Sequence, residues 1–494
     1  MNKRWVKYPL ALLCVFLVFI WNTPTASAFC GFFVDKTASQ LHNSSSRVVI
    51  AHSGNRSIFS MANDYQGDVK DFARIVPIPV VPNRDQVRIG NLETVERLNA
   101  FTTPRLVEYI DEPCIEEING FLMGVTVLVV SLPFVALVVA LILPRRARRL
   151  KELLVGLFLV GLFLIGIFAI ALPSMLSQAN KAKMPLFESA LNVTVEDKFT
   201  VGEYDVVILS AKQSNGLTTW LIQKGYKVPA GAQQMLQSYI AQGMKFFVVK
   251  VNLTEFDKSG YGFLRPIVLD YESPKFMLPI RLGTLNSPGE QDLIIHILSP
   301  DGYAEVSNYR TAPISTDTAS RKNEPSGEEL PYFLKEKDNF SKFYEAMFQQ
   351  EYERQGKNVA FLEYAGAIGF GECDPCTVPQ DEMLKLRELL PEIDPFNSSY
   401  VTRLHVRYTH EKFPKDLEFR IVGSEFDRFT EATAIFEKVS SLNIFQGRYV
   451  IRRPKSGASW IARLCYRKWN KRWTENLTRL TGWDKKEIGK MASR

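Results

Sequence analysis

Two long apolar runs dominate the pattern of hydrophobic and polar positions along the chain. Residues 118–143 and 153–176 contain no charged residue, and each run exceeds the roughly 20 apolar residues that a helix needs to cross a bilayer. Five Lys and Arg residues lie between the runs, and such a cationic loop favours the cytoplasmic side of a membrane. The pattern predicts a transmembrane helical hairpin at 118–176, with a cytoplasmic arginine-rich loop at 144–151.

Shorter patterns before and after these runs predict a mixture of strands and helices. Predicted strands are apolar, β-branched or aromatic segments bounded by turn residues, and predicted helices repeat apolar residues at a spacing of three or four. We expect strands at 47–51, 56–61, 72–78, 193–195, 204–209, 244–252, 262–271, 276–281, 292–298, 303–310, 358–364, 400–408 and 417–422, and helices at 92–98, 216–224, 231–242, 340–352, 381–390 and 459–481.

The polar segment 61–68 lies between two of the predicted strands. Its Asn and Asp side chains favour a turn, and a calcium site is the alternative, although the spacing does not fit an EF-hand loop. The segment 311–331 is rich in Ser, Thr, Pro and charge, which predicts a solvated loop.

The N-terminus has the pattern of a secretory signal peptide. Residues 1–28 combine a basic start, an apolar run at 8–21 and the small-residue triplet 26–28. We expect cleavage after Ala28, and an uncleaved signal that forms a third span is the alternative. Export agrees with the side predicted for the arginine-rich loop, because both place the rest of the chain outside the cytoplasm.

These elements predict an α+β fold, in which an extracytoplasmic mixed body is interrupted by the two-helix transmembrane hairpin. The two halves of the body, 29–117 and 177–447, would pack as one unit, and the segment 448–494 would follow them. We expect the protein to be integral to the cytoplasmic or an equivalent internal membrane. The bulk of the chain would then lie on the periplasmic side, with the lipid bilayer as its first partner.

Positive charge is concentrated at the C-terminus. Residues 448–494 hold 14 Lys and Arg against three acidic residues, whereas the net charge of the whole chain is +7, so the remainder is acidic. Tryptophans among cations suit a membrane–water interface or another anionic surface. The candidates for contact with anionic lipid headgroups or another envelope protein are Trp460, Trp469, Trp473, Arg467, Lys468, Lys471 and Arg472.

A second interpretation of this basic segment remains open. Its tryptophans could dock on the acidic body while its charges stay solvated. Basic and aromatic stretches also bind nucleic acid, but we expect no nucleic-acid partner because the segment is predicted to be exported.

Five cysteines follow the signal peptide, and cysteines outside the cytoplasm are usually oxidised. We expect disulfide bonds between Cys30 and Cys114 and between Cys373 and Cys376. The odd number leaves at least one thiol free or paired between molecules.

Cys373 and Cys376 are also weak candidates for thiol–disulfide exchange. Glu372 and Asp374 flank Cys373 and disfavour the reactive thiolate, so a structural bridge is the favoured interpretation. No second Cys/His pair with zinc spacing accompanies them, and we expect no metal.

The sequence lacks the common motifs of hydrolases and phosphate-binding enzymes. It has five histidines, and it contains no Gly-x-Ser-x-Gly, His-Glu-x-x-His or phosphate-loop motif. We expect each histidine to be a surface or hydrogen-bonded residue, and we expect no cofactor.

Several long phrases occur on both sides of the apolar runs. They are CGF at 30–32, MANDYQGD at 61–68, PRLVEY at 104–109, VGEYD at 201–205, GMKFF at 243–247, SPKFMLPIRLG at 273–283, CDPC at 373–376, FQGRYVIR at 445–452 and LTGW at 480–483. These phrases resemble an uncharacterised bacterial exported family, Domain of Unknown Function 2330. The resemblance implies export but no activity and no catalytic residues, and the predicted hairpin resembles an insertion into the family pattern.

The sequence therefore favours a membrane-anchored extracytoplasmic protein that is a non-enzymatic binding or envelope-structural module. The alternative is a thiol–disulfide oxidoreductase that uses Cys373 and Cys376. An envelope hydrolase without a recognisable motif is a third possibility.

Overall fold

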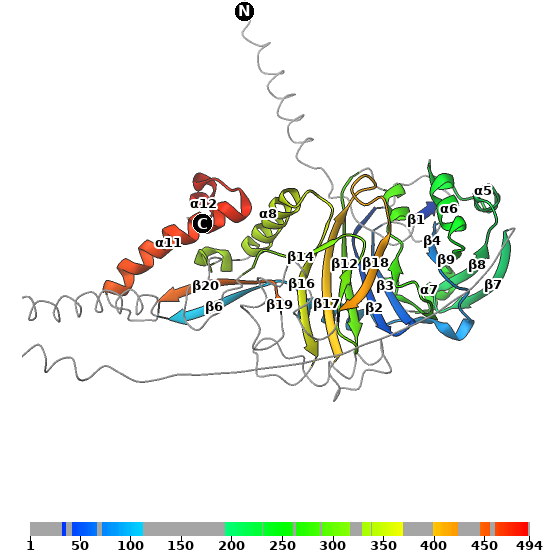
Figure 1. The fold of residues 1–494 in the computed structure, drawn as a ribbon, viewed down its shortest axis with the longest axis horizontal. Coiled ribbons are helices and arrows are strands. Elements are labelled where there is room, and N and C mark those ends of the chain that lie inside the picture. Colours follow the sequence, from blue (N-terminus) through cyan, green and yellow to red (C-terminus); the bar gives the residue numbers. More distant parts are fainter. Residues whose placement is uncertain are drawn as a thin grey trace, which may run out of the picture.

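Four β-sheets form the framework of the part of the chain that the computed structural model describes (Figure 1). The described residues are 32–35, 42–66, 72–111, 193–229, 231–259, 263–286, 289–316, 329–336, 338–368, 399–422, 445–454 and 460–492.

The largest sheet has nine strands and combines segments from before residue 112 and after residue 192. Its central strand β12 (Gln291–Ser299) runs parallel to β2 (His42–Ser53) and antiparallel to β17 (Ser399–Tyr408). Segments that are distant in the sequence therefore form one continuous sheet. The other strands are β14 (Arg310–Pro313), β16 (Val359–Ile368), β3 (Arg56–Gln66), β10 (Ile267–Glu272), β5 (Val87–Ile89) and β19 (Phe445–Gln446).

The second sheet has five antiparallel strands in the order β1-β4-β9-β8-β7. Helices α5 (Ser214–Gln223) and α6 (Ala232–Ala241) cover one of its faces through buried residues such as Leu221 and Leu236. The strands are β1 (Phe32–Asp35), β4 (Phe72–Ile78), β9 (Lys245–Val251), β8 (Tyr204–Ser210) and β7 (Thr194–Val201), and a short helix, α7 (Leu253–Ser259), follows β9.

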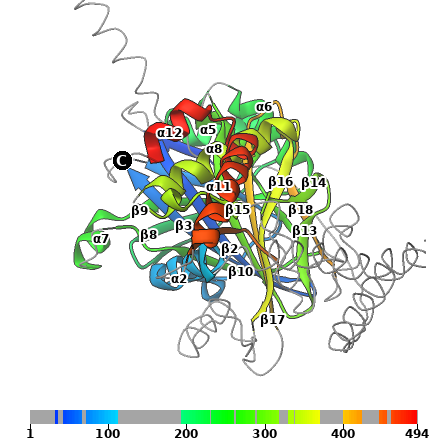
Figure 2. The same cartoon turned by 90° about the vertical axis from the view of Figure 1, so that its left-hand side faces the viewer.

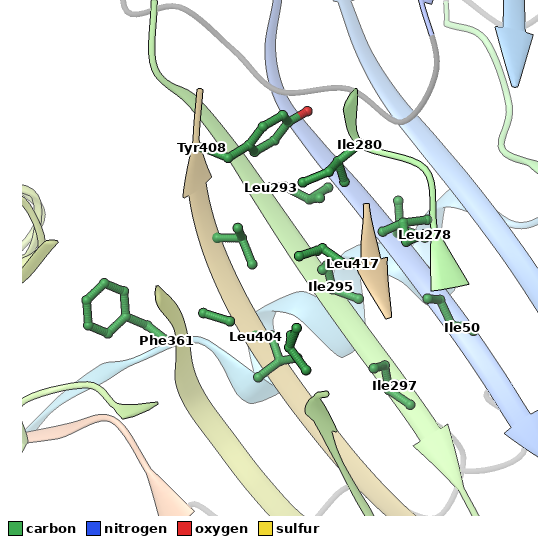
Figure 3. Close-up of a cluster of buried hydrophobic side chains, with 14 of the residues drawn as sticks. Ile50, Leu278, Ile280, Leu293, Ile295, Ile297, Phe361, Leu404, Tyr408 and Leu417 are labelled. Atoms are coloured by element: carbon green, nitrogen blue, oxygen red, sulfur yellow. The ribbon is translucent and has the colours of Figure 1, made fainter. Parts of the chain in front are cut away.

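Side chains from one face of the nine-stranded sheet form a large part of the main apolar core (Figure 3). Successive side chains of a strand point to opposite faces, so β12 places Leu293, Ile295 and Ile297 on this side. They lie among residues such as Leu417 from a small sheet of three strands, which are β11 (Met277–Leu278), β18 (Leu417–Val422) and β13 (Tyr303–Val306).

Two helices cover the opposite face of the nine-stranded sheet. Helix α2 (Leu92–Thr102) packs Val95 and Leu98 against Leu298 and Val401. Helix α8 (Asn339–Arg354) lies over β16 and β17 and presents Phe348 to them. This face is therefore also buried.

A parallel three-stranded sheet lies beside α8 and carries the C-terminal helices (Figures 1 and 2). Its order is β15 (Glu329–Leu330), β20 (Arg448–Pro454) and β6 (Arg105–Asp111), and the short helix η4 (Tyr332–Lys335) follows β15. Helix α11 (Trp460–Thr481) packs against α8, β15 and β20, and α12 (Lys485–Ala492) follows it.

The predicted fold class needs a correction. The described residues form a mixed α and β body, but none of their helices is long and apolar enough to cross a membrane. The longest of them, α11, has 22 residues and carries several cations, each of which opposes insertion into a bilayer. The transmembrane hairpin is thus unsupported by the described structure, and residues 118–176 lie outside the described residues.

A smaller correction concerns the polar segment 61–68. Residues up to Gln66 continue β3 instead of forming a turn, because Ala62 and Asn63 still pair with Arg47 and Ser46 of β2. Pairing with β2, and not the local polarity of the segment, determines the extended conformation of residues 61–66.

Candidate functional site: a buried chain of charges

Strand β17 supplies three cationic side chains to the covered face of the nine-stranded sheet. Arg403, His405 and Arg407 alternate with apolar residues and therefore share one face. On the neighbouring strand β12, Asp292 lies opposite Arg407 and His296 lies opposite Arg403. Charged and titratable groups thus collect beneath α8 and α2.

Glu363 enters the same region through an irregularity in β16. The pairing of β16 with β17 shifts between Leu362 and Tyr364, so Glu363 is an extra residue in its strand. Such a bulge changes the direction of a side chain. The backbone N–H of Gly447 donates to the Glu363 carbonyl at 2.7 Å and satisfies a backbone group at the bulge.

Five side chains form a continuous series of ion pairs, which we name the charge chain: Arg403–Glu363–His405–Asp292–Arg407. The Arg403 Nε donates to Glu363 at 2.6 Å, and the other Glu363 oxygen lies 2.7 Å from the His405 Nδ1. The His405 Nε2 lies 3.1 Å from Asp292, and Arg407 donates two hydrogen bonds to Asp292, at 2.7 and 2.8 Å. Each carboxylate therefore lies between two cationic or protonatable groups.

The charge chain extends from the interior toward the surface. The Glu363 side chain is 0 % exposed and that of Arg403 is 7 % exposed, whereas the Asp292 side chain is 29 % exposed. Solvent therefore reaches the Asp292 end and not the Glu363 end.

The partners in the charge chain set its protonation. Burial would raise the pKa of Glu363, but Arg403 and His405 outweigh burial and lower that pKa to about 2. Burial would also raise the pKa of Asp292, and here His405 and Arg407 hold it well below its usual range. Burial would lower the pKa of His405, but Glu363 and Asp292 raise it above 6.5. The imidazolium form is thus favoured, and the charges alternate in sign.

Helix α8 contacts the charge chain with three side chains. The Tyr344 hydroxyl donates to Glu363, and the Phe348 ring stacks on the His405 ring with a centroid distance of 3.9 Å. The Arg407 Nη1 donates to the Gln349 side chain at 2.5 Å. The charge chain therefore holds α8 on the sheet.

The C-terminal end of α2 closes the buried end of the charge chain. Arg403 donates to the Asn99 side chain at 2.7 Å and to the Asn99 carbonyl at 3.3 Å, where a cation complements the helix dipole. The Thr102 hydroxyl lies 2.9 Å from the His296 Nε2, and His296 is fully buried. Burial, assisted by Arg403, lowers the pKa of His296 well below 6.5, so this ring is neutral.

The geometry of His405 limits the chemistry of the charge chain. Both ring nitrogens face carboxylates, so neither is directed at a substrate. The two carboxylates also lie on opposite sides of the ring, and among the described residues no group of three or more His, Cys, Asp and Glu could hold a metal ion. The arrangement suits the uptake and release of one proton at His405.

A serine–histidine contact occurs elsewhere, in the β2–β3 hairpin. The His52 Nδ1 lies 2.8 Å from the Ser57 hydroxyl, and the His52 ring stacks on Phe276 at 3.7 Å. Burial lowers the pKa of His52 to about 4, although Asp301 acts in the opposite direction. Ser57 is only 1 % exposed, so the pair fits a packed core contact better than a nucleophile that meets substrate.

Comparison with protein families assigns this chain to a family. A family model described as an uncharacterized protein conserved in bacteria, DUF2330, matches residues 24–420. The chain belongs to the DUF2330 family. This confirms the predicted family membership, although the phrases at 445–452 and 480–483 lie beyond the matched segment. No curated protein and no solved structure matches the chain.

All five residues of the charge chain lie within the DUF2330 match, whereas the predicted cysteine sites cannot be placed. Cys30, Cys114, Cys373 and Cys376 lie outside the described residues, and the side chain of Cys465 is not described either. The expected disulfide bonds and the oxidoreductase pair therefore stay predictions.

The C-terminal candidates of this DUF2330 member fall into two groups. Trp473 is 1 % exposed and its indole N–H donates to Glu329 at 3.0 Å, while Lys471 and Arg472 of the same helix are exposed. The side chains of Trp460, Trp469, Arg467 and Lys468 are not described, and contact of this segment with a membrane surface stays a prediction.

No sequence pattern predicted the charge chain, although the sequence contains a signal for it. Glu363 is the only charged residue in the apolar segment Val359–Ile368, and a lone charge in a buried strand requires a partner. The alternation at Arg403, His405 and Arg407 resembles a solvent-exposed face, and only the position of α8 shows that this face is covered.

Proposed function

We propose that this DUF2330 member is a non-enzymatic binding module that holds anionic lipid headgroups on the surface of its C-terminal helices. We name the exposed cations Lys471, Arg472, Lys485 and Lys486 of α11 and α12 the basic surface. The observation that carries the proposal is that α11 is anchored to the body by its buried side, so its cations project from a fixed support.

The anchor of α11 is a buried carboxylate. Glu329 accepts from the Trp473 indole at 3.0 Å and from the Arg452 Nε at 2.5 Å, and its backbone carbonyl accepts from Asn476 at 3.1 Å. Leu477 of α11 is also fully buried. Within residues 470–481 of α11, whose side chains the structure describes, the apolar residues are thus used for docking and the charged residues face outward.

Helix α12 continues the basic surface. The Asp484 carboxylate accepts from the backbone N–H groups of Lys486 and Glu487, both at 2.7 Å, and so caps the start of the helix. Ile488 is buried against the body, while Lys485 and Lys486 are exposed. The cap and the buried Ile488 fix the orientation of α12 and with it the position of these cations.

Electrostatic attraction is the form of lipid binding that this surface suits. Each Lys or Arg near an anionic membrane contributes about 1 kcal/mol, and the attraction falls within a Debye length. Binding would therefore be peripheral and sensitive to salt. The extracytoplasmic location predicted from residues 1–28 stays a prediction.

The closed geometry of the charge chain supports the non-enzymatic part of the proposal. Glu363 and Asp292 are each bound on both sides by cationic partners, and His405 is held between them. Groups arranged in this way stabilise one another and stiffen the support of the C-terminal helices.

Vesicle co-sedimentation of the full chain tests the proposal. We expect binding to vesicles with about one-third anionic phospholipid, no binding to neutral vesicles, and loss of binding at high salt. The variant Lys471→Glu/Arg472→Glu should weaken binding by at least about 2 kcal/mol, or roughly 30-fold. Lys224→Glu/Lys227→Glu is the matched control, because these exposed lysines lie beside α5 at the other end of the molecule.

Three results would contradict the proposal. Equal affinity for neutral and anionic vesicles, or equal losses in the two double variants, would remove the role of the basic surface. Reduction of insulin by the wild type that disappears in Cys373→Ser would instead replace the non-enzymatic module with an oxidoreductase.

A further inference from the structure

Helix α8 connects the charge chain to the helices that carry the basic surface. Its Tyr344, Phe348 and Gln349 contact Glu363, His405 and Arg407 on the sheet. At the same time it packs against α11 (Figures 1 and 2). A change in the contact between α8 and the sheet is therefore transmitted to α11.

Helix α8 makes close contacts with the C-terminal unit, by which we mean the three-stranded sheet β15-β20-β6 together with α11 and α12. Its Phe343 packs edge-on against Tyr449 of β20, with a centroid distance of 5.0 Å. Gly482, which follows α11 with a φ of 72°, lies so near α8 that an added Cβ would be 3.2 Å from the Gln350 side-chain oxygen. The C-terminal unit is thus seated directly on α8.

The position of His405 makes the contact of α8 dependent on one proton. As an imidazolium, His405 donates one N–H to Glu363 and the other to Asp292. A neutral imidazole has a single N–H, so one carboxylate would then face a lone pair. The groups that face or flank this ring are Glu363 from β16, Asp292 and the neutral His296 from β12, Arg403 and Arg407 from β17 itself, and Tyr344 from α8.

The outer contact is the one that deprotonation would break. Glu363 is inaccessible to water and keeps the remaining N–H, whereas Asp292 is 29 % exposed and can be solvated instead. Asp292 also holds Arg407, and Arg407 donates to Gln349 of α8. Loss of the His405–Asp292 contact therefore loosens α8 at Gln349.

We propose that the charge chain is a proton-controlled latch, which holds α8 and the C-terminal basic surface in place while His405 is protonated and loosens them when it is not. This inference rests on the proposed function for its consequence, because the latch would regulate the presentation of the basic surface. Glu363 and Asp292 raise the pKa of His405 above its ordinary value despite burial, so the change lies at a higher pH than for a free histidine.

Hydrogen exchange of the full chain tests the latch. Amide protection of α8 and α11, corrected for the intrinsic exchange rate, should fall by at least about tenfold between pH 6.5 and 9, as expected for loss of one charge-assisted hydrogen bond. His405→Gln should make this profile flat. His410→Gln, which changes an exposed histidine just beyond β17, is the matched control and should keep the wild-type profile.

A second variant keeps the test informative if His405→Gln does not fold. Asp292→Asn neutralises the outer carboxylate, which pairs with Arg407 and raises the pKa of His405, so the midpoint of the exchange profile should move to lower pH. A flat wild-type profile, or a midpoint that Asp292→Asn leaves unchanged, would overturn the latch.

Parallel vesicle binding separates the two proposals. If hydrogen exchange depends on pH as expected but the protein does not bind anionic vesicles, the latch is supported and the proposed function is overturned. Selective binding to anionic vesicles with a flat exchange profile would sustain the function and overturn the latch.

Discussion

The two faces of the nine-stranded sheet are both buried, yet strand β17 presents opposite chemistry to them. On one face, Leu404 and Val406 of β17 pack into the apolar core shown in Figure 3. On the other, the alternate residues Arg403 and His405 of the same strand form ion pairs beneath α8. A shift of one residue in β17 would exchange the two sets, so the difference between the faces specifies the strand register.

The two faces contribute to stability in different ways. An apolar side chain contributes through its own buried area, roughly 1.5–3 kcal/mol for a Leu. A buried ion pair contributes little net stability, because desolvation offsets the attraction, but removal of one partner leaves an uncompensated charge and is strongly destabilising. Each substitution on the apolar face should therefore lower the free energy of unfolding by its own separate amount. Substitution of one residue in the charge chain should instead weaken the ion pairs of the others as well.

The largest effect is expected from Glu363→Ala. This change leaves Arg403 and His405 buried without the carboxylate that they share, and should lower the free energy of unfolding by about 3–5 kcal/mol. Urea denaturation near pH 6 measures it. Glu411→Ala is the control, because Glu411 is exposed and should change stability by less than about 0.5 kcal/mol. A loss below about 1 kcal/mol for Glu363→Ala would mean that the buried charges do not depend on one another.

Much of the sheet framework could be predicted from the sequence, because strand patterns are local. The predicted strands 72–78 and 417–422 coincide with β4 and β18. The predicted strand 276–281 shortens to Met277–Leu278 because the Asp416 carboxylate accepts the backbone N–H groups of Ile280 and Arg281. That hydrogen bond spans more than 100 residues, and no local pattern contains it.

The charge chain could not be predicted for the same reason. Asp292 and Arg407 are 115 residues apart, and Glu363 and Arg403 are 40 residues apart. Alternating charge on β17 is compatible with solvent exposure as well as with burial. Only the tertiary position of α8 decides between the two, and the bulge at Glu363 depends on the register with β17.

A second substitution tests the apolar face of the same strand. Leu404 is fully buried and is the neighbour in sequence of Arg403, which pairs with Glu363. Leu404→Ala should lower the free energy of unfolding by about 3 kcal/mol. The loss should be the same at pH 5 and pH 8, because no titrating group is removed. Stability measured by urea at both pH values checks this. A loss that varies strongly with pH would show that the two faces do not act independently.

The pH dependence of stability tests the contribution of His405 to the charge chain. We expect a smaller effect here than for Glu363→Ala or Leu404→Ala. The raised pKa of His405 means that its contribution is complete below about pH 6.5 and is lost as the pH rises through the folded-state value. As the pH rises through this value, the free energy of unfolding of the wild type should fall by about 1.5–2 kcal/mol more than that of His405→Gln. This difference is the contribution of one charged hydrogen bond.

The acid side of the same profile has the opposite sign. The pKa of Glu363 falls from 4.5 to about 2, so its contribution is present above pH 4.5 and is lost as the pH falls toward 2. The charge chain should therefore be most stabilising between about pH 4.5 and 6.5. A wild-type profile parallel to that of His405→Gln above pH 6.5 would contradict this assignment.

The smallest effect is expected at Trp473, a buried side chain that combines an apolar ring with a hydrogen bond to a buried carboxylate. Trp473→Phe keeps most of the apolar ring of α11 but removes the indole N–H that donates to Glu329 at 3.0 Å. Glu329 retains the Arg452 guanidinium at 2.5 Å, so its charge stays compensated and the loss should be only about 1 kcal/mol. Trp220→Phe on α5, where the indole lies near Lys224, is the matched control and should be nearly neutral. A loss of 3 kcal/mol or more for Trp473→Phe in urea denaturation would mean that Arg452 alone cannot hold the Glu329 carboxylate, and that this pair, like the charge chain, depends on every partner.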